Sequence, residues 1–240
     1  MLHKNITKWI KNYTVSANFN HLVVGISGGI DSSVVSTLCA ETNIPTTVVT
    51  MPIRQKLYQN DLSLKHAQWL SKRYKNVKHQ VIDLNSVFDA FESLFNKNNN
   101  LALANSRSRL RMVTLYQIAT SNNGLVVGTG NKVEDFGVGF YTKYGDGGVD
   151  ISPIGDCLKT EVWSMGKHLG ILQEIIDAPP TDGLWDDDRN DEDQLGMSYQ
   201  ELEQAMEDYD NNIINTNVEK FLEIQKKNLH KMVPIPIYKK

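Results

Sequence analysis

The stretch "HLVVGISGGIDSSVVSTLCAE", residues 21–41, sets a glycine-rich turn between two apolar segments. The first segment, "HLVVGIS", is short, apolar and rich in β-branched residues, which predicts a buried strand. After the turn, Val34, Val35 and Leu38 recur at helical spacing, so a helix should follow, with Asp31 or Ser32 capping its first turn. A strand, a tight turn and a helix in direct succession are typical of a sheet covered by helices.

The turn itself, "SGGIDSS" at residues 27–33, has the chemistry of an anion site. Two adjacent glycines let backbone N–H groups face a ligand, and the helix start adds unsatisfied donors and a positive dipole end. Ser27, Ser32 and Ser33 can add hydroxyl donors. Asp31 would repel bare phosphate, but it fits a site where Mg²⁺ bridges the phosphates. An ordinary turn with an aspartate cap is the alternative; the stretch matches neither a Walker A loop nor GxGxxG.

The same alternation continues along the chain. Further strands are predicted in "TTVVTMPI", "VKHQVIDL" and "LVVGTG". Between them lie helical patterns, one expected to start at Asn60 or Asp61 and another to end at Gly124. We therefore predict an α/β fold, with a doubly wound parallel sheet flanked by helices in a single domain over residues 1–240. Ligands bind such sheets at the carboxyl ends of the strands, where residues 27–33 and 128–134 fall.

The N-terminal segment and the composition narrow the class of protein. Residues 1–14 lack the apolar core of a signal peptide and instead predict a short amphipathic helix that has on one face Ile6, Trp9, Ile10 and Tyr13. The chain has 240 residues, 40% of them hydrophobic, and a net charge of −3, so it can bury a sizeable core but shows no basic excess. We expect no nucleic-acid partner, and no apolar run approaches the roughly 18 residues of a membrane span.

The two cysteines, Cys39 and Cys157, form no CxxC and no metal-ligand spacing. Their pattern favours a reduced, cytoplasmic protein.

After a strand, "SGGIDSS" resembles the pyrophosphate loop of the ATP pyrophosphatases, which cleave ATP between its α and β phosphates. This group includes NAD synthetases, the synthetase parts of GMP and asparagine synthetases, and tRNA-modifying ligases. The resemblance implies that ATP or its pyrophosphate binds at Gly25, Ser27, Gly28, Gly29, Ile30, Asp31, Ser32 and Ser33.

Other segments choose among these families. "FYTKYGDGGVDISP" followed by "KTEV" resembles the signature of NAD synthetases, within a glycine-dense stretch, residues 128–171, that we expect to be mostly loop. "NSRSRLRM" at 105–112, "PPTDGLWDDDRNDEDQLG" at 179–196 and "LHKMVPIP" near the C-terminus are also similar to motifs of that family. The family implies an adenine nucleotide alpha hydrolase-like fold and the amidation of deamido-NAD with ammonia and ATP, through an acyl-adenylate.

The resemblance also implies site residues, which divide by ligand. ATP would bind, besides the loop, Thr129, Lys159 and Thr181. Deamido-NAD would bind Asn105, Arg109, Arg111, Lys143, Asp146, Asp150, His230 and Lys231. Magnesium would be held by Asp31, Glu134 and Thr181, and the catalytic residues would be Asp146, Lys159 and Lys143.

The chain departs from the family pattern at several positions. Many members have "GTDHxxE" where this chain has "GTGNKVE", so we assign no chemistry to Gly130 and Asn131. Asp182 and Leu158 also replace commoner residues, Arg107 lies outside the match, and the acid run at residues 186–193 fits a solvated loop better than a metal site.

Two other functions are possible for such a chain, and its domain composition and oligomeric state also have to be predicted. A tRNA-modifying ATP pyrophosphatase would be expected to have a basic surface and often catalytic cysteines. An inactive nucleotide-binding protein would be expected to lack Asp31, Glu134 or Lys159, and all three are present. The loop begins 26 residues from the first residue, so we expect no fused glutaminase domain and an enzyme that uses ammonia. The family further implies a homodimer.

Overall fold

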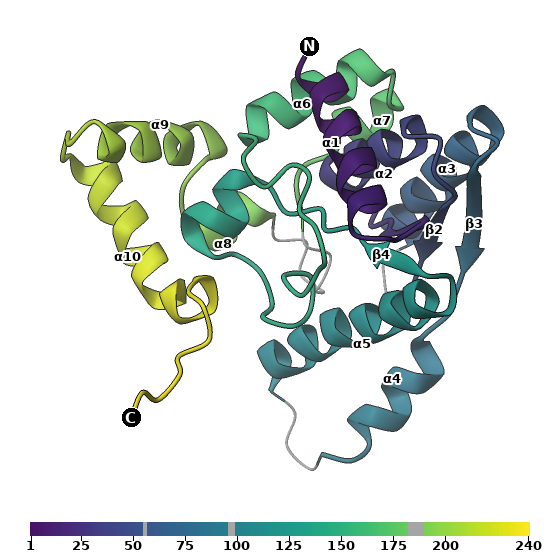
Figure 1. Cartoon of the computed structure of the whole chain (residues 1–240). Coiled ribbons are helices and arrows are strands. Elements are labelled where there is room, and N and C mark those ends of the chain that lie inside the picture. The colour runs from purple at the N-terminus through teal and green to yellow at the C-terminus, as the bar shows by residue number, and fades with distance from the viewer. Residues whose placement is uncertain (55–56, 96–98, 182–189) are drawn as a thin grey trace.

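The computed structural model describes residues 1–54, 57–95, 99–181 and 190–240 (Figure 1). Four strands form one sheet: β1 (His21–Gly25), β2 (Thr46–Thr50), β3 (Val77–Val81) and β4 (Gly124–Val126). Their order is β3-β2-β1-β4 and every pairing is parallel, which confirms the predicted α/β class. After β1 the chain builds outward through β2 and β3 and then returns to the other side, so the strand order switches between β1 and β4.

The helices connect and cover these strands. Before the π-helix the chain forms α1 (Leu2–Ser16), α2 (Ile30–Glu41), α3 (Leu57–Arg73), α4 (Asn85–Glu92) and α5 (Asn100–Ser121). The π-helix η1 (Lys132–Val138) is followed by α6 (Lys159–Leu169), α7 (Gln173–Ile176), α8 (Asp191–Leu195), α9 (Tyr199–Asp210) and α10 (Thr216–Met232). Within the described ranges, no helix is both long and apolar enough to cross a membrane.

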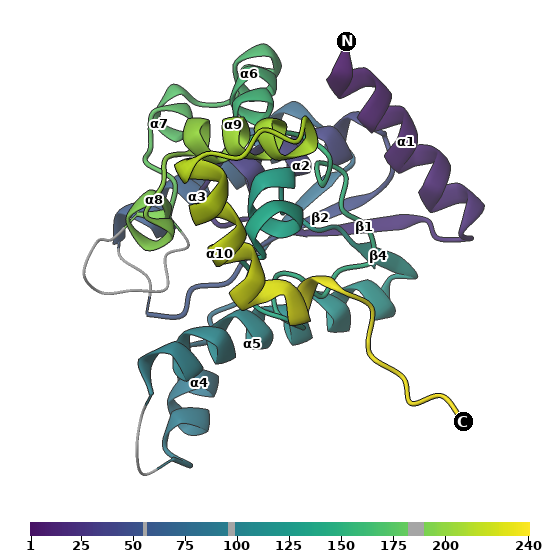
Figure 2. The same cartoon turned by 90° about the vertical axis from the view of Figure 1, so that its left-hand side faces the viewer.

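Helices cover both faces of the sheet because successive strand residues point to opposite sides. Leu22 and Val24 pack into a core shared with α1, α2 and α6. Val23 faces the other way, into a second core with Val49 and side chains of α4 and α5. Figures 1 and 2 show α5 crossing one side of the sheet, with α1, α2 and α6 on the other. The doubly wound arrangement is therefore confirmed.

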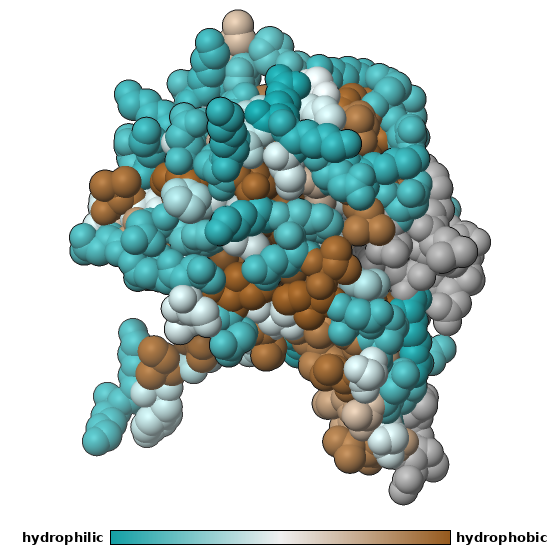
Figure 3. Space-filling view, turned by 90° about the vertical axis from the view of Figure 1, so that its right-hand side faces the viewer, coloured by the Kyte–Doolittle hydropathy of each residue, from teal (hydrophilic) through white to brown (hydrophobic). Residues whose placement is uncertain are grey.

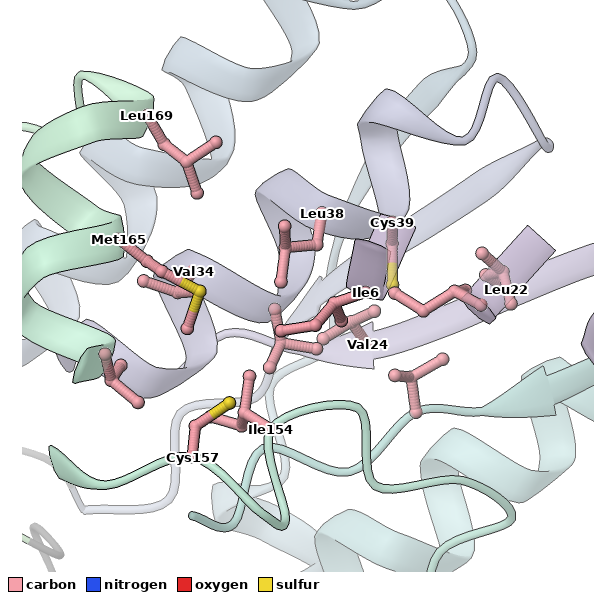
Figure 4. Packing of buried hydrophobic residues seen from close by; sticks show 14 of the residues in the cluster. Ile6, Leu22, Val24, Val34, Leu38, Cys39, Ile154, Cys157, Met165 and Leu169 are labelled. Atoms are coloured by element: carbon pink, nitrogen blue, oxygen red, sulfur yellow. The ribbon is translucent and has the colours of Figure 1, made fainter. Parts of the chain in front are cut away.

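Both cysteines belong to the first of these cores. Figure 4 shows Cys39 and Cys157 among side chains that converge from α1, α2, α6 and β1, including Ile6, Leu38 and Met165. Both are free thiols, and burial raises their pKa, to about 11 for Cys157. Neutral, buried thiols are poor nucleophiles, so these residues serve packing.

Several expected helix details are wrong. In α1 the inward face consists of His3, Ile6, Ile10 and Thr14, whereas Trp9 and Tyr13 are 45% and 41% exposed. Burial of Thr14 in place of the aromatic rings is possible because its hydroxyl donates to the carbonyl of Ile10 at 2.7 Å.

Three helix boundaries also differ from expectation. The N-cap of α2 is Gly29, so the cap was predicted on the wrong residue. Helix α3 begins at Leu57, ahead of Asn60 and Asp61. Helix α5 ends at Ser121, since Gly124 is already paired in the sheet as the first residue of β4.

The glycine-dense segment after β4 holds more regular structure than expected. It contains η1 and α6, and η1 packs against α9 and α10 through Val133, Val138, Leu202 and Phe221. Figure 1 shows α9 and α10 standing beside the sheet domain, joined to it through η1 and α8. A π-helix is uncommon and is found mostly at functional sites.

Candidate active site

The serine-glycine loop leaves β1 at the switch in strand order and leads directly into α2. Gly28 has φ 94°, a left-handed conformation that favours glycine. The Ser32 hydroxyl accepts from the backbone N of Ser27 at 3.2 Å and donates to the carbonyl of Gly29 at 3.1 Å, where Ser33 donates as well. The loop is thus preorganised, with the N-terminus of α2 behind it as a positive dipole end.

The other predicted residues of the loop have two kinds of surroundings. Gly25 and Ile30 pack against the core, whereas Asp31 contacts polar side chains. Gly25 ends β1 close to Met51 and Leu115, and Ile30 is 5% exposed and packs into the core. The carboxylate of Asp31 instead accepts hydrogen bonds from Asn131, just before η1, and from Lys159 of α6.

Asp31, Glu134 and Lys159 form one cluster, although they come from α2, η1 and α6; the lysine is buried and the two carboxylates are largely buried. Lys159 Nζ lies 2.6 Å from Asp31 Oδ2 and 2.9 Å from Glu134 Oε1. The lysine residue is 1% exposed. Burial alone would lower the pKa of Lys159, but the two carboxylates raise it, so the lysine stays charged. Three predicted site residues therefore do meet.

The two carboxylates of this cluster differ in their electrostatics. Burial is the largest effect on Asp31 and raises its pKa despite attraction to Lys159. Burial acts in the same direction on Glu134, but attraction to Lys159 and hydrogen bonds from Tyr199 and Lys159 outweigh it and lower the pKa of Glu134. Glu134 is thus the more firmly ionised of the pair.

Tyr199, which the sequence analysis did not identify, completes the cluster from the first turn of α9. Its hydroxyl lies 2.5 Å from Glu134 Oε1 and 3.2 Å from Asp191 Oδ2, and Lys159 Nζ lies 4.8 Å from the centre of its ring. Burial raises the pKa of Tyr199, so the neutral hydroxyl donates a hydrogen bond. Tyr199 therefore orients Glu134 and stabilises its charge.

Asn131, to which the sequence assigned no chemistry, has a structural role in the site. Its side chain is fully buried; Nδ2 donates to Asp31 Oδ1 at 3.2 Å, and Oδ1 accepts from the backbone N of Val133 and of Glu134. One amide thus caps η1 and fixes Asp31. A neutral amide can do both because it has a donor and an acceptor.

A second cluster forms around Asp146, in the loop after η1. Asp146 Oδ1 accepts from Ser108 Oγ at 2.6 Å and from the backbone N of Thr142 at 3.1 Å. Loss of surrounding water raises the pKa of Asp146, while the hydrogen bonds from Ser108 and Thr142 act in the opposite direction. Sequence reasoning missed Ser108, which ties Asp146 to α5.

The predicted basic residues converge on the same loop from α5 and α10. Arg109 Nε donates to the carbonyl of Lys143 at 3.1 Å, and Lys143 Nζ donates to the carbonyl of His230 at 3.4 Å. Lys231 Nζ donates to the carbonyl of Tyr141 at 2.8 Å. On the other side, Asn105 Oδ1 accepts from the hydroxyl of Thr142 at 2.7 Å. Four predicted residues thus contact the loop that carries the fifth, Lys143; they are Asn105, Arg109, His230 and Lys231.

Arg111 lies deeper on α5, where its Nε donates to the carbonyl of Met51 at 3.1 Å. Burial lowers the pKa of Arg111 to about 10. Its Nη2 is buried and has no hydrogen-bond partner among the residues that the structure describes. A buried guanidinium with an unused donor is suited to binding an anion.

The carboxylate of Asp150 is already engaged in hydrogen bonds within the protein. Its carboxylate accepts from the backbone N of Val126 at 2.7 Å and from Tyr116 at 3.1 Å, so it ties the loop to β4. The predicted ligand role of Asp150 stays a prediction.

Two predicted residues lie at the edges of the site. Thr129 follows β4 and is partly exposed, and Thr181 is exposed immediately before the undescribed residues 182–189. Asp182 and part of the acid run, residues 186–189, lie outside the described residues. Within the described ranges, no group of three or more His, Cys, Asp or Glu side chains could hold a metal ion by itself. The carboxylates that could contribute to a shared ion are those of Asp31 and Glu134.

Comparisons with known proteins show which family this chain belongs to. The family model described as NAD synthase matches residues 2–239. A relative from Finegoldia magna, named NH(3)-dependent NAD(+) synthetase, is 39% identical over 204 residues, 84% of this chain and 82% of its own. A relative of the same name from Staphylothermus marinus is 36% identical over 98% of this chain and 89% of its own.

Among solved structures, an NMN synthetase from Francisella tularensis superposes with a TM-score of 0.88 at 29% identity, covering 99% of this chain and 97% of its own.

Proposed function

Because the chain belongs to the NAD synthase family, we propose that it is an ammonia-dependent NAD synthetase, which amidates deamido-NAD with ATP and releases AMP and pyrophosphate. One observation carries this proposal. The loop at residues 27–33 lies at the switch in strand order, where Lys159 pairs with both its Asp31 and Glu134. A phosphate-binding loop beside a buried lysine and two carboxylates suits displacement of pyrophosphate from the α-phosphorus of ATP.

The chemistry explains why ATP is needed. A carboxylate does not react directly with ammonia, because oxide would be the leaving group. In the proposed reaction a carboxylate oxygen of the nicotinate attacks the α-phosphorus of ATP, the bond to the β-phosphate oxygen breaks, and pyrophosphate leaves. Ammonia then attacks the acyl carbon, the acyl–oxygen bond breaks, and AMP leaves. A base must take a proton from nitrogen, because ammonia is mostly protonated at neutral pH.

The side chains have complementary parts in this reaction. The loop donors and the N-terminus of α2 hold the departing pyrophosphate. Lys159 stabilises negative charge on phosphate or on the tetrahedral oxyanion, and Lys143 can assist from the loop after η1. In this proposal Asp146 accepts a proton from the nitrogen nucleophile. Arg111 offers a buried donor for a phosphate of either nucleotide.

The donor set fits Mg²⁺ when ATP is present. Asp31 and Glu134 offer carboxylate oxygens, which Mg²⁺ prefers, and Mg²⁺ usually takes one or two protein carboxylates and completes its shell with phosphate oxygens and water. We propose that these two residues hold the ion, with Thr181 approaching a second one. When bound, Mg²⁺ offsets negative charge on the phosphates.

The rival functions fit less well. A tRNA-modifying enzyme that uses a cysteine would need an accessible thiol, whereas Cys39 and Cys157 lie in the core. An inactive nucleotide-binding protein would not need Asp31, Glu134 and Lys159 in one buried cluster. A second acceptor deserves a test because the Francisella relative is named an NMN synthetase. Nicotinate mononucleotide carries the same carboxylate without the adenylyl half, so it is the second candidate substrate.

We also propose a cytoplasmic homodimer of a single-domain chain that uses free ammonia. Figure 3 shows apolar side chains gathered along the middle of one face and onto the arm formed by α4 and α5. Exposed apolar residues on this arm and on the C-terminal tail include Leu94, Phe95, Leu101, Val113, Ile235 and Ile237. Their burial against a second copy would stabilise a dimer. Light scattering of wild type and Val113→Lys tests this assembly.

The proposed function is tested with the purified chain, ATP, Mg²⁺ and ammonium, supplied with either deamido-NAD or nicotinate mononucleotide. We expect NAD and AMP in equal amounts and a higher kcat/KM for deamido-NAD. Replacing ammonium with glutamine should abolish product. ADP as the nucleotide product would contradict the proposal, and a higher kcat/KM for the mononucleotide would favour the second candidate.

A further inference from the structure

Helix α9 contacts both partners of the ion pair between Lys159 and Glu134. Tyr199, in the first turn of α9, donates a hydrogen bond from its hydroxyl to Glu134. Glu203 lies one turn further along, and its carboxylate accepts twice from Thr160, the residue that follows Lys159. Oε1 accepts from the backbone N of Thr160 at 2.9 Å, and Oε2 accepts from its hydroxyl at 2.8 Å. One face of a single helix therefore reaches both sides of the ion pair.

Glu203 pairs with a backbone donor that α6 itself leaves unsatisfied. Lys159 and Thr160 are the first two residues of α6, so their backbone N–H groups have no partner within the helix. The N-cap residue is Leu158, which has no side-chain oxygen to accept from them. Glu203 supplies the acceptor from another helix, and a carboxylate at a helix N-terminus is also favoured by the helix dipole.

The contact between α6 and α9 leaves Lys159 little freedom. Trp163, one turn after Lys159, meets the ring of Tyr199 edge to face, with the ring centres 5.9 Å apart and the planes at 82°. The side chain of Lys159 is 2% exposed and is held by both Asp31 and Glu134. A shift of the start of α6 relative to α9 would therefore be passed on to Nζ of Lys159.

We propose that Glu203 is a positioning residue, which holds the start of α6 so that Nζ of Lys159 stays where it stabilises the transition state. The inference rests on the proposed function, because that reaction gives Lys159 this role. Glu203 acts through Thr160 and the backbone rather than on the reacting atoms. Its loss should affect turnover more than substrate binding, since Lys159 acts on charge that grows during the reaction.

Glu203→Ala tests this inference in the purified chain, supplied with ATP, Mg²⁺, ammonium and deamido-NAD. We expect kcat to fall about tenfold or more, because a misplacement of about 1 Å can cost about a hundredfold in rate. The KM values for ammonium and deamido-NAD should stay within about twofold, since ground-state binding is kept. Glu207→Ala is the matched control and should keep the wild-type kcat, because Glu207 is exposed one turn further along α9.

Two more variants separate the hydrogen bonds from the charge. In Glu203→Gln the amide oxygen can accept from the backbone N of Thr160 and the amide nitrogen can donate to its hydroxyl, so most of the lost turnover should return. Thr160→Val removes the hydroxyl from the other side of the contact and should also lower kcat. In a Glu203→Ala background it should add little, because both changes act on one interaction. Thr160→Val keeps the inference testable if Glu203→Ala folds poorly, as judged by thermal unfolding.

A wild-type kcat in folded Glu203→Ala would overturn the inference and leave the proposed function standing. Raised KM values at an unchanged kcat would also overturn it, since they indicate an effect on binding alone. Equal losses of kcat in Glu203→Ala and Glu203→Gln would do the same, because they indicate a role of the charge and not of the hydrogen bonds. A wild-type chain that forms no amide from ammonium would instead overturn the proposed function.

Discussion

Lys159 Nζ and Asp31 Oδ2 lie 2.6 Å apart, although the two residues are separated by 128 positions in the sequence. The pair joins the start of α6 to the start of α2 in a setting where the lysine side chain is 2% exposed. Lys159 supplies the counter-charge for both Asp31 and Glu134, so its loss would leave two neighbouring carboxylates without that cation.

Lys159→Met should therefore lower the free energy of unfolding by about 3–5 kcal/mol, because two buried carboxylates lose their counter-charge. Mg²⁺ should restore part of that loss by binding the same carboxylates. Lys132→Met, which breaks an exposed ion pair with Asp156, should cost less than about 1 kcal/mol. Urea unfolding with and without Mg²⁺ measures each value. Similar losses in the two variants would show that the buried cluster contributes no more than a surface pair.

Tyr199→Phe should weaken the site while keeping the aromatic ring over Lys159. Removing a hydroxyl that donates to an ionised group should cost about 1.5–3 kcal/mol of stability, and it should raise the pKa of Glu134, which that bond helps to lower. The Mg²⁺ concentration for half-maximal NAD formation should rise. Tyr209→Phe, on the exposed side of the same helix, is the control. A Tyr199→Phe enzyme with wild-type Mg²⁺ dependence would argue against an orienting role.

His66 should make stability depend on pH. Its Nε2 lies 3.0 Å from Oγ of Ser36 in α2. Burial lowers the pKa of His66 to about 4. Between that value and the usual 6.5, the unfolded chain binds a proton that the folded chain does not. The stabilisation is therefore complete above about pH 6.5 and is lost as the pH falls, by about 2 kcal/mol at about pH 5.

His66→Gln should consequently flatten the decline in unfolding free energy between about pH 8 and about pH 5. Comparing the two proteins cancels the contributions of the other titrating groups. Parallel curves for wild type and His66→Gln would mean that His66 does not cause the decline.

Ser108→Ala should change the pH dependence of turnover through Asp146. The Ser108 hydroxyl lowers the pKa of Asp146, so its loss should raise that pKa. If the ionised carboxylate accepts the proton, the acidic limb of kcat/KM for ammonium should move to higher pH. Ser106→Ala, which removes a hydroxyl bonded to Ala102 on the same helix, should leave the limb in place. An unmoved limb in Ser108→Ala, or full turnover in Asp146→Asn at low ammonium, would exclude Asp146 as the acceptor.

The fold could be predicted because its signals are local. The apolar strand, the glycine turn and the helical spacing in residues 21–41 each depend on neighbours in sequence, and the alternation of such units implies a parallel sheet. Helix boundaries were less predictable. Gly124 reads as a helix end, but pairing with His21 in the sheet decides its place.

Only the site residues that stand in recognisable sequence motifs could be predicted. Asp31, Glu134 and Lys159 stand in recognisable segments, whereas Tyr199 and Ser108 act across 65 and 38 positions through contacts that no local pattern encodes. In the sequence, Gly130 and Asn131 only mark the absence of the aspartate and histidine that many family members have at these positions. In the structure the amide of Asn131 fixes Asp31, and the bare backbone of Gly130 makes room for Asp135.

The most direct test of the proposed reaction follows an oxygen atom. Deamido-NAD labelled with ¹⁸O in its nicotinate carboxylate should be incubated with the chain, ATP, Mg²⁺ and ammonium, and the phosphorus products analysed by mass spectrometry. Attack on the α-phosphorus followed by ammonia predicts one ¹⁸O in AMP and none in pyrophosphate. Label in inorganic phosphate, with ADP as the nucleotide product, would contradict the acyl-adenylate and the role assigned to the loop at residues 27–33.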